Sequence, residues 1–300
     1  MILSLPKLSL IEYYILQSKT KKFLISDYNL DATLSSGQSF RWEKIGKDWE
    51  GVIGQQWIKL RSDHQYIIAE TAIPQHNWEW LKKYLQLDFN LNQAIESFPD
   101  DKPIKNALNA TPGLRLLRQD YWETLAAFIL SATKQIVQIQ QMVSLLSKRY
   151  GEQIVANGGS PVFAFPTIQA IADCTEKELR ACKLGFRAPN LLAAARDILN
   201  NKINWQQIPL MDSTEAREEL IKLRGVGQKI ADCILLFAGG HQHVFPIDVW
   251  IERALQRLYF AKSKPSSHKL RHFADNHFGP FAGLAQQYIF HHARIHLKLK

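Results

Sequence analysis

The pattern of apolar and polar residues changes near residue 117. Before that point, apolar residues alternate with polar ones in short runs, which predicts an antiparallel sheet. The predicted strands cover residues 39–42, 49–53, 57–60 and 66–69. Helical spacing follows over residues 77–85 and 91–97, and Pro103, Pro112 and Gly113 then mark a connecting region.

After residue 117 the apolar spacing is almost entirely helical, with breaks at Gly151, at 158–161, at Gly185 and at 239–240. A chain of 300 residues is long enough for two ordinary domains. We therefore expect an α+β fold. An N-terminal antiparallel β-sheet domain with helices is predicted over residues 1–117, and a mostly α-helical domain over residues 118–300.

A short glycine-rich segment separates two helical stretches between residues 223 and 233. It reads Leu-Arg-Gly-Val-Gly-Gln-Lys-Ile-Ala-Asp-Cys. Gly225 and Gly227 can adopt positive φ and leave backbone N–H groups open, which predicts a tight helical hairpin. N–H groups at the start of a helix bind phosphate, so Gly225, Val226, Gly227 and Gln228 are expected to contact a phosphate backbone.

Two residues of this region have the chemistry of a nucleophile and its partner. Lys229 begins the second helix, where the positive end of the helix dipole favours a neutral, nucleophilic amine. Asp248 follows one short apolar stretch later and would supply a carboxylate. Apolar residues at helical spacing follow Asp248, so it is also expected to be an N-cap. The alternative is that Lys229 only touches phosphate and Asp248 only caps a helix.

Composition limits the kinds of partner and the cellular location. The net charge of +9 suits a polyanion. Three cysteines without a close pair indicate neither a zinc ribbon nor a disulfide framework, which favours a reduced, intracellular protein. Residues 1–15 lack the pattern of a secretory signal, and no stretch approaches the roughly 20 apolar residues of a membrane span, so no membrane association is expected.

The hairpin with its lysine and downstream aspartate resembles the helix-hairpin-helix base-excision DNA glycosylases. Four further segments, at 36–42, 114–120, 184–188 and 279–290, resemble the eukaryotic-type 8-oxoguanine DNA glycosylase. The resemblance implies that Lys229 attacks the sugar of a flipped-out nucleotide, expels the base and holds the sugar as a Schiff base before β-elimination. It further implies a monomer without metal or redox cofactor, acting on double-stranded DNA with 8-oxoguanine opposite cytosine.

The resemblance also implies a base-binding pocket. In the last helix, Gln286 and Phe290 lie four residues apart, opposite the apolar stripe, where spacing alone favours an exposed Gln and a Phe packed on the other domain. The resemblance makes them base contacts. It assigns recognition of the lesion's N7–H to the carbonyl of Gly37, and contact with the other base face to Cys233. Without it, Gly37 marks a bulge or turn and Cys233 a small core residue.

A Gly-Phe-Arg loop places Phe186 beside Arg187, a pair suited to entering the vacated base stack and reaching the orphaned base. Three positions depart from the family. The chain has Thr133 where the family has Asn, Gln138 where it has Arg, and Trp250 where it has His. The first two predict weaker selection of the opposite cytosine, and the third leaves the phosphate contact near Asp248 open.

Two other functions fit parts of this pattern. A glycosylase of the same fold could act on another damaged base, although Gly37, Cys233, Gln286 and Phe290 together favour 8-oxoguanine. A non-catalytic module that binds damaged DNA would need the hairpin but not Lys229 and Asp248 together. Covalent trapping on DNA distinguishes the enzyme from such a module.

Overall fold

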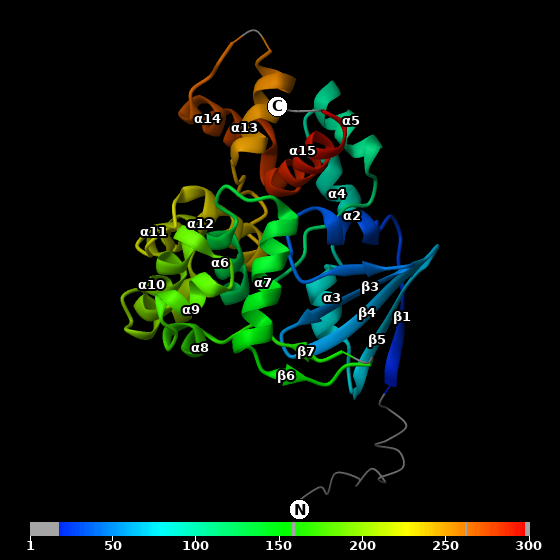
Figure 1. The fold of residues 1–300 in the computed structure, drawn as a ribbon. Coiled ribbons are helices and arrows are strands. Elements are labelled where there is room, and N and C mark those ends of the chain that lie inside the picture. The colour runs from blue at the N-terminus through cyan, green and yellow to red at the C-terminus, as the bar shows by residue number, and fades with distance from the viewer. Residues whose placement is uncertain (1–17, 158–159, 262, 298–300) are drawn as a thin grey trace, which may run out of the picture.

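The computed structural model describes residues 18–157, 160–261 and 263–297 (Figure 1). The segment inspected for a secretory signal, residues 1–15, and part of the predicted break at 158–161 lie outside these ranges. The predicted fold class is confirmed, since an antiparallel sheet with helices precedes a mostly helical part. Within the described ranges, no helix combines the length and apolarity needed to cross a membrane.

The N-terminal part contains β1 (Ser18–Leu24), α2 (Leu30–Ser35), β2 (Glu43–Ile45), β3 (Asp48–Ile53), β4 (Gln56–Asp63), β5 (Tyr66–Gln75), α3 (Glu79–Leu85), α4 (Leu91–Glu96) and α5 (Lys102–Ala110). Its strands form an antiparallel sheet in the order β1-β5-β4-β3-β2. The alternation that predicted β3, β4 and β5 reflects their buried residues. Leu60 and Ile67 pack with Leu81 and Leu85 of α3 in one apolar cluster.

One predicted strand is wrong. Residues 39–42 form no strand, and β2 begins only at Glu43. The alternation there is misleading, because Ser39, Phe40 and Trp42 are all buried where the sheet meets the helices. Trp42 donates its indole N–H to the hydroxyl of Tyr84 on α3 at 2.8 Å, whereas the ring of Phe40 meets Phe128 in the helical part.

The sequence reading also missed β1, α2 and α5. The last of these lies in the region assigned to a connection because of Pro103. Pro103 stands in the first turn of α5, behind the N-cap Asp101, where its missing N–H would be unpaired in any case. Proline therefore marked the start of a helix here, not a break.

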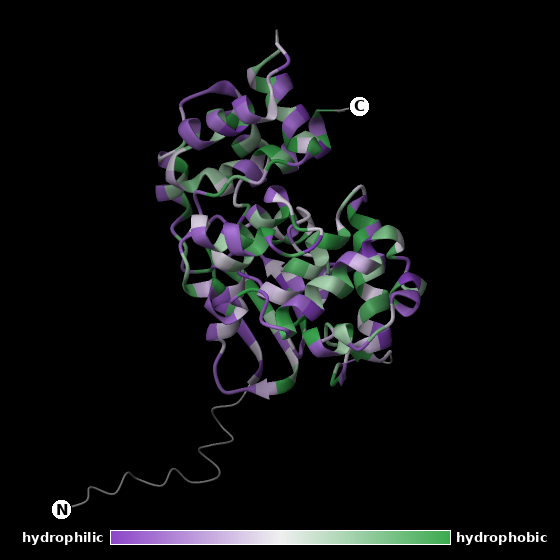
Figure 2. Cartoon of the chain, turned by 90° about the vertical axis from the view of Figure 1, so that its left-hand side faces the viewer, coloured by the Kyte–Doolittle hydropathy of each residue, from purple (hydrophilic) through white to green (hydrophobic). Residues whose placement is uncertain are grey.

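The C-terminal part contains α6 (Tyr121–Leu130), α7 (Ile136–Tyr150), β6 (Gln153–Ile154), β7 (Val162–Phe163), α8 (Ile168–Ala172), α9 (Glu176–Ala181), η1 (Gly185–Arg187), α10 (Ala188–Leu199), η2 (Trp205–Leu210), α11 (Ser213–Ile221), α12 (Gln228–Ile234), η3 (Leu235–Gly239), α13 (Val249–Tyr259), α14 (Ser267–His277), η4 (Gly279–Phe281) and α15 (Ala282–His296). Its hydrophobic residues lie mostly toward the inside (Figure 2).

The two parts meet along α7 and α15. In Figure 1, α7 lies between the other helices and the sheet. Arg41 fixes this junction by donating to the hydroxyl of Ser147 on α7 at 2.8 Å and to the carbonyl of Phe163 on β7 at 2.5 Å. Helix α15 packs against both α5 and α13. The C-terminal helix is thus held close to the loop after α2, and this arrangement positions the site.

Candidate active site

A cavity of about 320 Å³ opens where seven segments converge. They are the loop after α2, the C-terminal end of α6, the start of α7, helix α12, η3, the start of α13 and helix α15. The cavity brings together seven of the residues singled out in the sequence, which are Gly37, Lys229, Cys233, Asp248, Trp250, Gln286 and Phe290. Residues more than two hundred positions apart therefore share one site.

Lys229 reaches the cavity from the hairpin between α11 and α12. Gly225 has φ +81° as expected, and a Cβ there would lie 2.6 Å from the side chain of Asn190. Gly227 differs from the prediction, because its φ is −97° and it serves as the N-cap of α12. Glycine has no side chain, so this N-cap makes no side-chain hydrogen bond to the first N–H groups of α12. Val226 is buried, and Gln228 is exposed.

The amine of Lys229 is held by the end of α6. Its Nζ donates to the hydroxyl of Ser131 at 3.1 Å and lies 4.9 Å from the ring centroid of Phe128. Both of these residues also line the cavity. Lys229 is thus a half-buried cavity residue and not only a surface side chain of its helix.

Asp248 is the N-cap of α13, as its sequence context predicted. Its side chain accepts from the backbone N–H of Ile251 at 2.8 Å. This cap fixes the carboxylate at the cavity wall, so a structural role and an electrostatic role are compatible in one residue.

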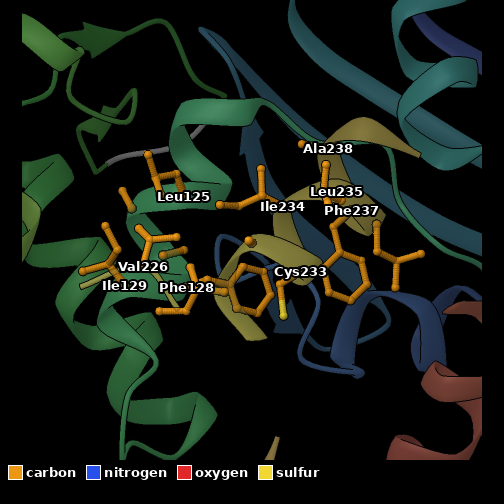
Figure 3. Packing of buried hydrophobic residues seen from close by; sticks show 14 of the residues in the cluster. Leu125, Phe128, Ile129, Val226, Cys233, Ile234, Leu235, Phe237 and Ala238 are labelled. Atoms are coloured by element: carbon orange, nitrogen blue, oxygen red, sulfur yellow. The ribbon is translucent and has the colours of Figure 1, made fainter. Parts of the chain in front are cut away.

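Cys233 lies one helical turn after Lys229 and faces the same cavity. Figure 3 shows it beside Phe128 and Phe237 in the packing between α6 and α12. Burial raises the pKa of its thiol to about 12, with Lys229 opposing and Asp248 adding to the shift. At neutral pH the cavity therefore presents a protonated, polarisable thiol, not a thiolate.

Gly37 adopts φ +80°, and a Cβ there would lie 2.5 Å from Cδ1 of Ile136 and 3.4 Å from the ring of Phe290. The neighbouring residues fix this loop. The side chain of Gln38 donates to the carbonyl of Arg115 at 2.8 Å and accepts from the N–H of Leu117 at 2.7 Å. On the other side, Gln287 of α15 donates to the carbonyl of Ser36 at 3.0 Å. The backbone at Gly37 is therefore rigid and approaches the cavity closely.

Gln286 and Phe290 come from α15, which begins at Ala282 after the 3₁₀ turn η4. Gln286 is 5% exposed, which rules out the exposed glutamine of the simpler interpretation. Its Oε1 is buried without a hydrogen-bond donor among the described residues. A buried acceptor in a cavity wall that has no protein partner can accept a hydrogen bond from a bound ligand.

Comparisons with known proteins identify the family of this chain. The model of the N-terminal domain of 8-oxoguanine DNA glycosylase matches residues 22–125, and that of the HhH-GPD superfamily of base excision DNA repair proteins matches residues 126–279. The N-glycosylase/DNA lyase of Saccharomyces cerevisiae is 31% identical over 265 residues, covering 78% of this chain and 69% of the yeast protein.

Two solved structures are similar over nearly their whole length. MBOgg1 in complex with a low-affinity DNA ligand has a TM-score of 0.87 at 30% identity, covering 92% of this chain and 96% of that one. The Clostridium acetobutylicum 8-oxoguanine glycosylase/lyase, in complex with double-stranded DNA containing cytosine opposite 8-oxoG, has a TM-score of 0.85 at 29% identity, covering 91% and 97%. The chain belongs to the 8-oxoguanine DNA glycosylase family.

Phe186 and Arg187, which were expected to enter the vacated base stack and to reach the orphaned base, do not line the cavity. Phe186 is 57% exposed, as a wedge requires. Arg187 is only 2% exposed, and its guanidinium lies 4.1 Å from the Phe186 ring centroid. It donates to the carbonyl of Ala132 and, at 2.7 Å, to the hydroxyl of Thr133. Arg187 therefore does not project from the surface in this structure, and its contact with an orphaned base stays a prediction.

The departures from the family have distinct local roles. Thr133 has φ +56°, which is strained for a β-branched residue. Gln138 is exposed and belongs to the capping box of α7, where its Oε1 accepts from the N–H of Gln135 at 3.2 Å. Only its amide N–H groups remain to donate outward. Trp250 is 39% exposed at the cavity rim, two residues after Asp248.

Several functional candidates of this glycosylase-family chain escaped sequence reasoning. Ser131 and Phe128 hold the lysine, and Lys134 and Arg294 add positive charge to the cavity lining. None of these residues belongs to a motif or a periodic pattern that would identify it from the sequence.

All three cysteines are free thiols. Across the described residues, no group of three or more His, Cys, Asp or Glu side chains is arranged to hold a metal ion.

Proposed function

We propose that this protein is a bifunctional enzyme that excises 8-oxoguanine from duplex DNA and then cleaves the strand by β-elimination. The observation that carries the proposal is the presence of Lys229 and Asp248 in one cavity with Gly37, Gln286 and Phe290. A nucleophilic amine, a fixed carboxylate and base-sized walls are the groups that the reaction requires.

In the excision step, Nζ of Lys229 attacks C1′ of the flipped-out nucleotide. The Nζ–C1′ bond forms while the C1′–N9 bond breaks, and the departing base takes a proton. Asp248 stabilises the positive charge that develops on the sugar. Ring opening then gives the imine, loss of a proton from C2′ expels the 3′ phosphate, and the strand is cleaved.

Recognition of the lesion follows from its changed hydrogen-bonding edge. 8-Oxoguanine carries a hydrogen on N7, where guanine has only an acceptor. In the proposal the carbonyl of Gly37 accepts this N7–H, and Gln286 pairs with the Watson–Crick edge. The unpaired Oε1 of Gln286 supports this, because a guanine-type base offers N–H donors at that edge. Phe290 and Cys233 then contact opposite faces of the ring.

The remaining contacts hold the duplex. Phe186 enters the vacated stack, and backbone N–H groups of residues 225–228 bind phosphate, with Trp250 near the lesion strand. In the proposal, Gln138 and Thr133 face the opposite cytosine, and Arg187, which is bound to Ala132 and Thr133 in this structure, turns toward it on DNA binding. The uncharged amide of Gln138 and the short side chain of Thr133 predict weaker cytosine selection than a second arginine would give. We expect the enzyme to act as an intracellular monomer on DNA.

Borohydride trapping tests the proposal. The protein incubated with an 8-oxoguanine:cytosine duplex and borohydride should form a covalent adduct that peptide mapping places on Lys229. Lys229→Gln should abolish the adduct but retain binding of the lesion duplex. Lys134→Gln is the matched control, because this lysine lines the same cavity and should keep the adduct. An undiminished adduct in Lys229→Gln would refute the assignment, and no adduct in the wild type would favour a binding module.

A further inference from the structure

Among the described residues, the hydroxyl of Ser131 accepts a side-chain hydrogen bond from the proposed nucleophile. Ser131 is the C-cap of α6, and it lines the cavity next to Lys229. Lys229 donates to its Oγ across 98 positions of sequence, at 3.1 Å. We propose that Ser131 is a positioning residue that orients the Lys229 amine for attack. This inference rests on the proposed function.

The direction of the hydrogen bonds matters for this role. The Ser131 hydroxyl donates its hydrogen to the carbonyl of Phe128 at 2.7 Å. Its hydrogen is thereby occupied, so the oxygen acts toward Lys229 as an acceptor. An acceptor that binds an N–H of a neutral amine leaves the nitrogen lone pair free. A hydroxyl that donated to the amine would cover that lone pair and block attack.

Aromatic packing around the end of α6 makes the position of the Lys229 amine rigid. The ring of Phe128, 4.9 Å from Nζ, is stacked on Phe237 with centroids 5.5 Å apart and is met edge-on by Phe40 at 5.7 Å. Figure 3 shows Phe128 and Phe237 in this packing. The last turn of α6 therefore supplies two fixed contacts to a long, flexible side chain. Ordering the amine before the sugar arrives removes part of the orientational cost of the reaction.

Two variants of Ser131 separate the effect of the hydroxyl from the effect of side-chain shape. Ser131→Thr keeps a hydroxyl, whereas Ser131→Val has nearly the same shape as threonine without one. The backbone at Ser131 is helical, with φ −70° and ψ −18°, and both residues are compatible with it. Ser97→Ala is the matched control, because Ser97 is the C-cap of α4 and makes the same local bond, to the carbonyl of Ala94 at 2.7 Å, away from the cavity.

The measurement is base release from an 8-oxoguanine:cytosine duplex under single-turnover conditions, together with affinity for a duplex carrying a non-cleavable abasic analogue. Loss of one orienting hydrogen bond should slow Ser131→Val about tenfold at unchanged affinity. Ser131→Thr should recover most of the wild-type rate, and Ser97→Ala should match the wild type. Thermal melting of all variants checks that the fold is intact.

The outcomes distinguish this inference from the proposed function. Equal rates for Ser131→Val and the wild type, or equally slow Thr and Val variants, would overturn the positioning role while leaving Lys229 as the nucleophile. Absence of base release and of an adduct in the wild type would overturn the proposed function and this inference with it.

Discussion

Replacing Gly37 with alanine would place a methyl group against the side chains that line the cavity, and the distances in the structure allow the loss of stability to be estimated. The residue has φ +80°, a conformation that L-residues rarely adopt. The new Cβ would lie 2.5 Å from Cδ1 of Ile136 and 3.4 Å from Cε1 of Phe290. The first of these separations is far inside the ordinary carbon–carbon contact distance of about 3.5–4.0 Å. The side chain of Ile136, which lines the cavity, must therefore move.

Two terms set the expected loss of stability. A left-handed backbone costs an L-residue about 1–2 kcal/mol. Moving Ile136 away from its preferred rotamer adds about 1 kcal/mol. Gly54→Ala is a control for the first term alone, because Gly54 has φ +57° in the turn between β3 and β4 and a Cβ there has no neighbour within 4 Å. We expect about 2–3 kcal/mol for Gly37→Ala and about 1–2 kcal/mol for Gly54→Ala.

Urea unfolding measures these differences, and binding of the 8-oxoguanine duplex measures their functional consequence. Gly37→Ala should lose about tenfold or more in affinity for the lesion, equivalent to about 1.4 kcal/mol, because the added methyl group and the displaced Ile136 narrow the cavity. Gly54→Ala should bind as the wild type does. If Gly37→Ala were no less stable than Gly54→Ala and bound the lesion normally, the argument for close approach at Gly37 would be wrong.

Three further predictions concern other residues. Asp248→Asn should retain the cap of α13 and its melting temperature but slow single-turnover base release on the order of 10²–10³-fold, and an unchanged rate would leave Asp248 as a cap only. Burial raises the pKa of Glu123 from 4.5 to about 7, so its contribution to stability is complete below pH 4.5 and is lost as the pH rises through 7. Glu123→Gln should remove up to about 3 kcal/mol of this pH dependence in urea titrations, whereas an identical slope would contradict the burial argument. Gln138→Arg should raise the preference for cytosine opposite the lesion by about 1–3 kcal/mol in excision rates opposite C, T, G and A. A strict preference already present, and unaffected by Gln138→Ala, would show that another residue reads the cytosine.

The sequence predicted the elements whose burial follows a simple period. Strands β3, β4 and β5 have one face buried under α3, so alternation identifies them. Residues 39–42 have the same alternation, but neighbours from two different directions bury Phe40 and Trp42. A period of two cannot distinguish these cases, because it reports burial and not hydrogen bonding between strands.

The same limit applies to the site. Lys229 begins a helix after the glycine hairpin, and Asp248 precedes a clear apolar helix, so local spacing marks these two residues. Cys233 lies one turn after Lys229, but its role as a base contact came from the family resemblance, because spacing alone makes it a core residue. Local spacing could not identify Ser131, because its hydrogen bond with Lys229 depends on how α6 packs against α12. The inward orientation of Arg187 depends likewise on its contact with the loop after α6. No local pattern around Arg187 in the sequence indicates that contact.

The loop between α6 and α7 connects the two sides of the site. Its first residue, Ser131, accepts the hydrogen bond of Lys229. Two residues later, Thr133 accepts from Arg187 in a strained backbone conformation with φ +56°. Backbone strain of this kind persists only where surrounding contacts impose it, and here Arg187 supplies them through Ala132 and Thr133. Moving Arg187 toward an orphaned base would release those contacts next to Ser131. A substitution at Thr133 therefore cannot be interpreted as a change in opposite-base recognition alone, since the same five-residue loop also supports the amine.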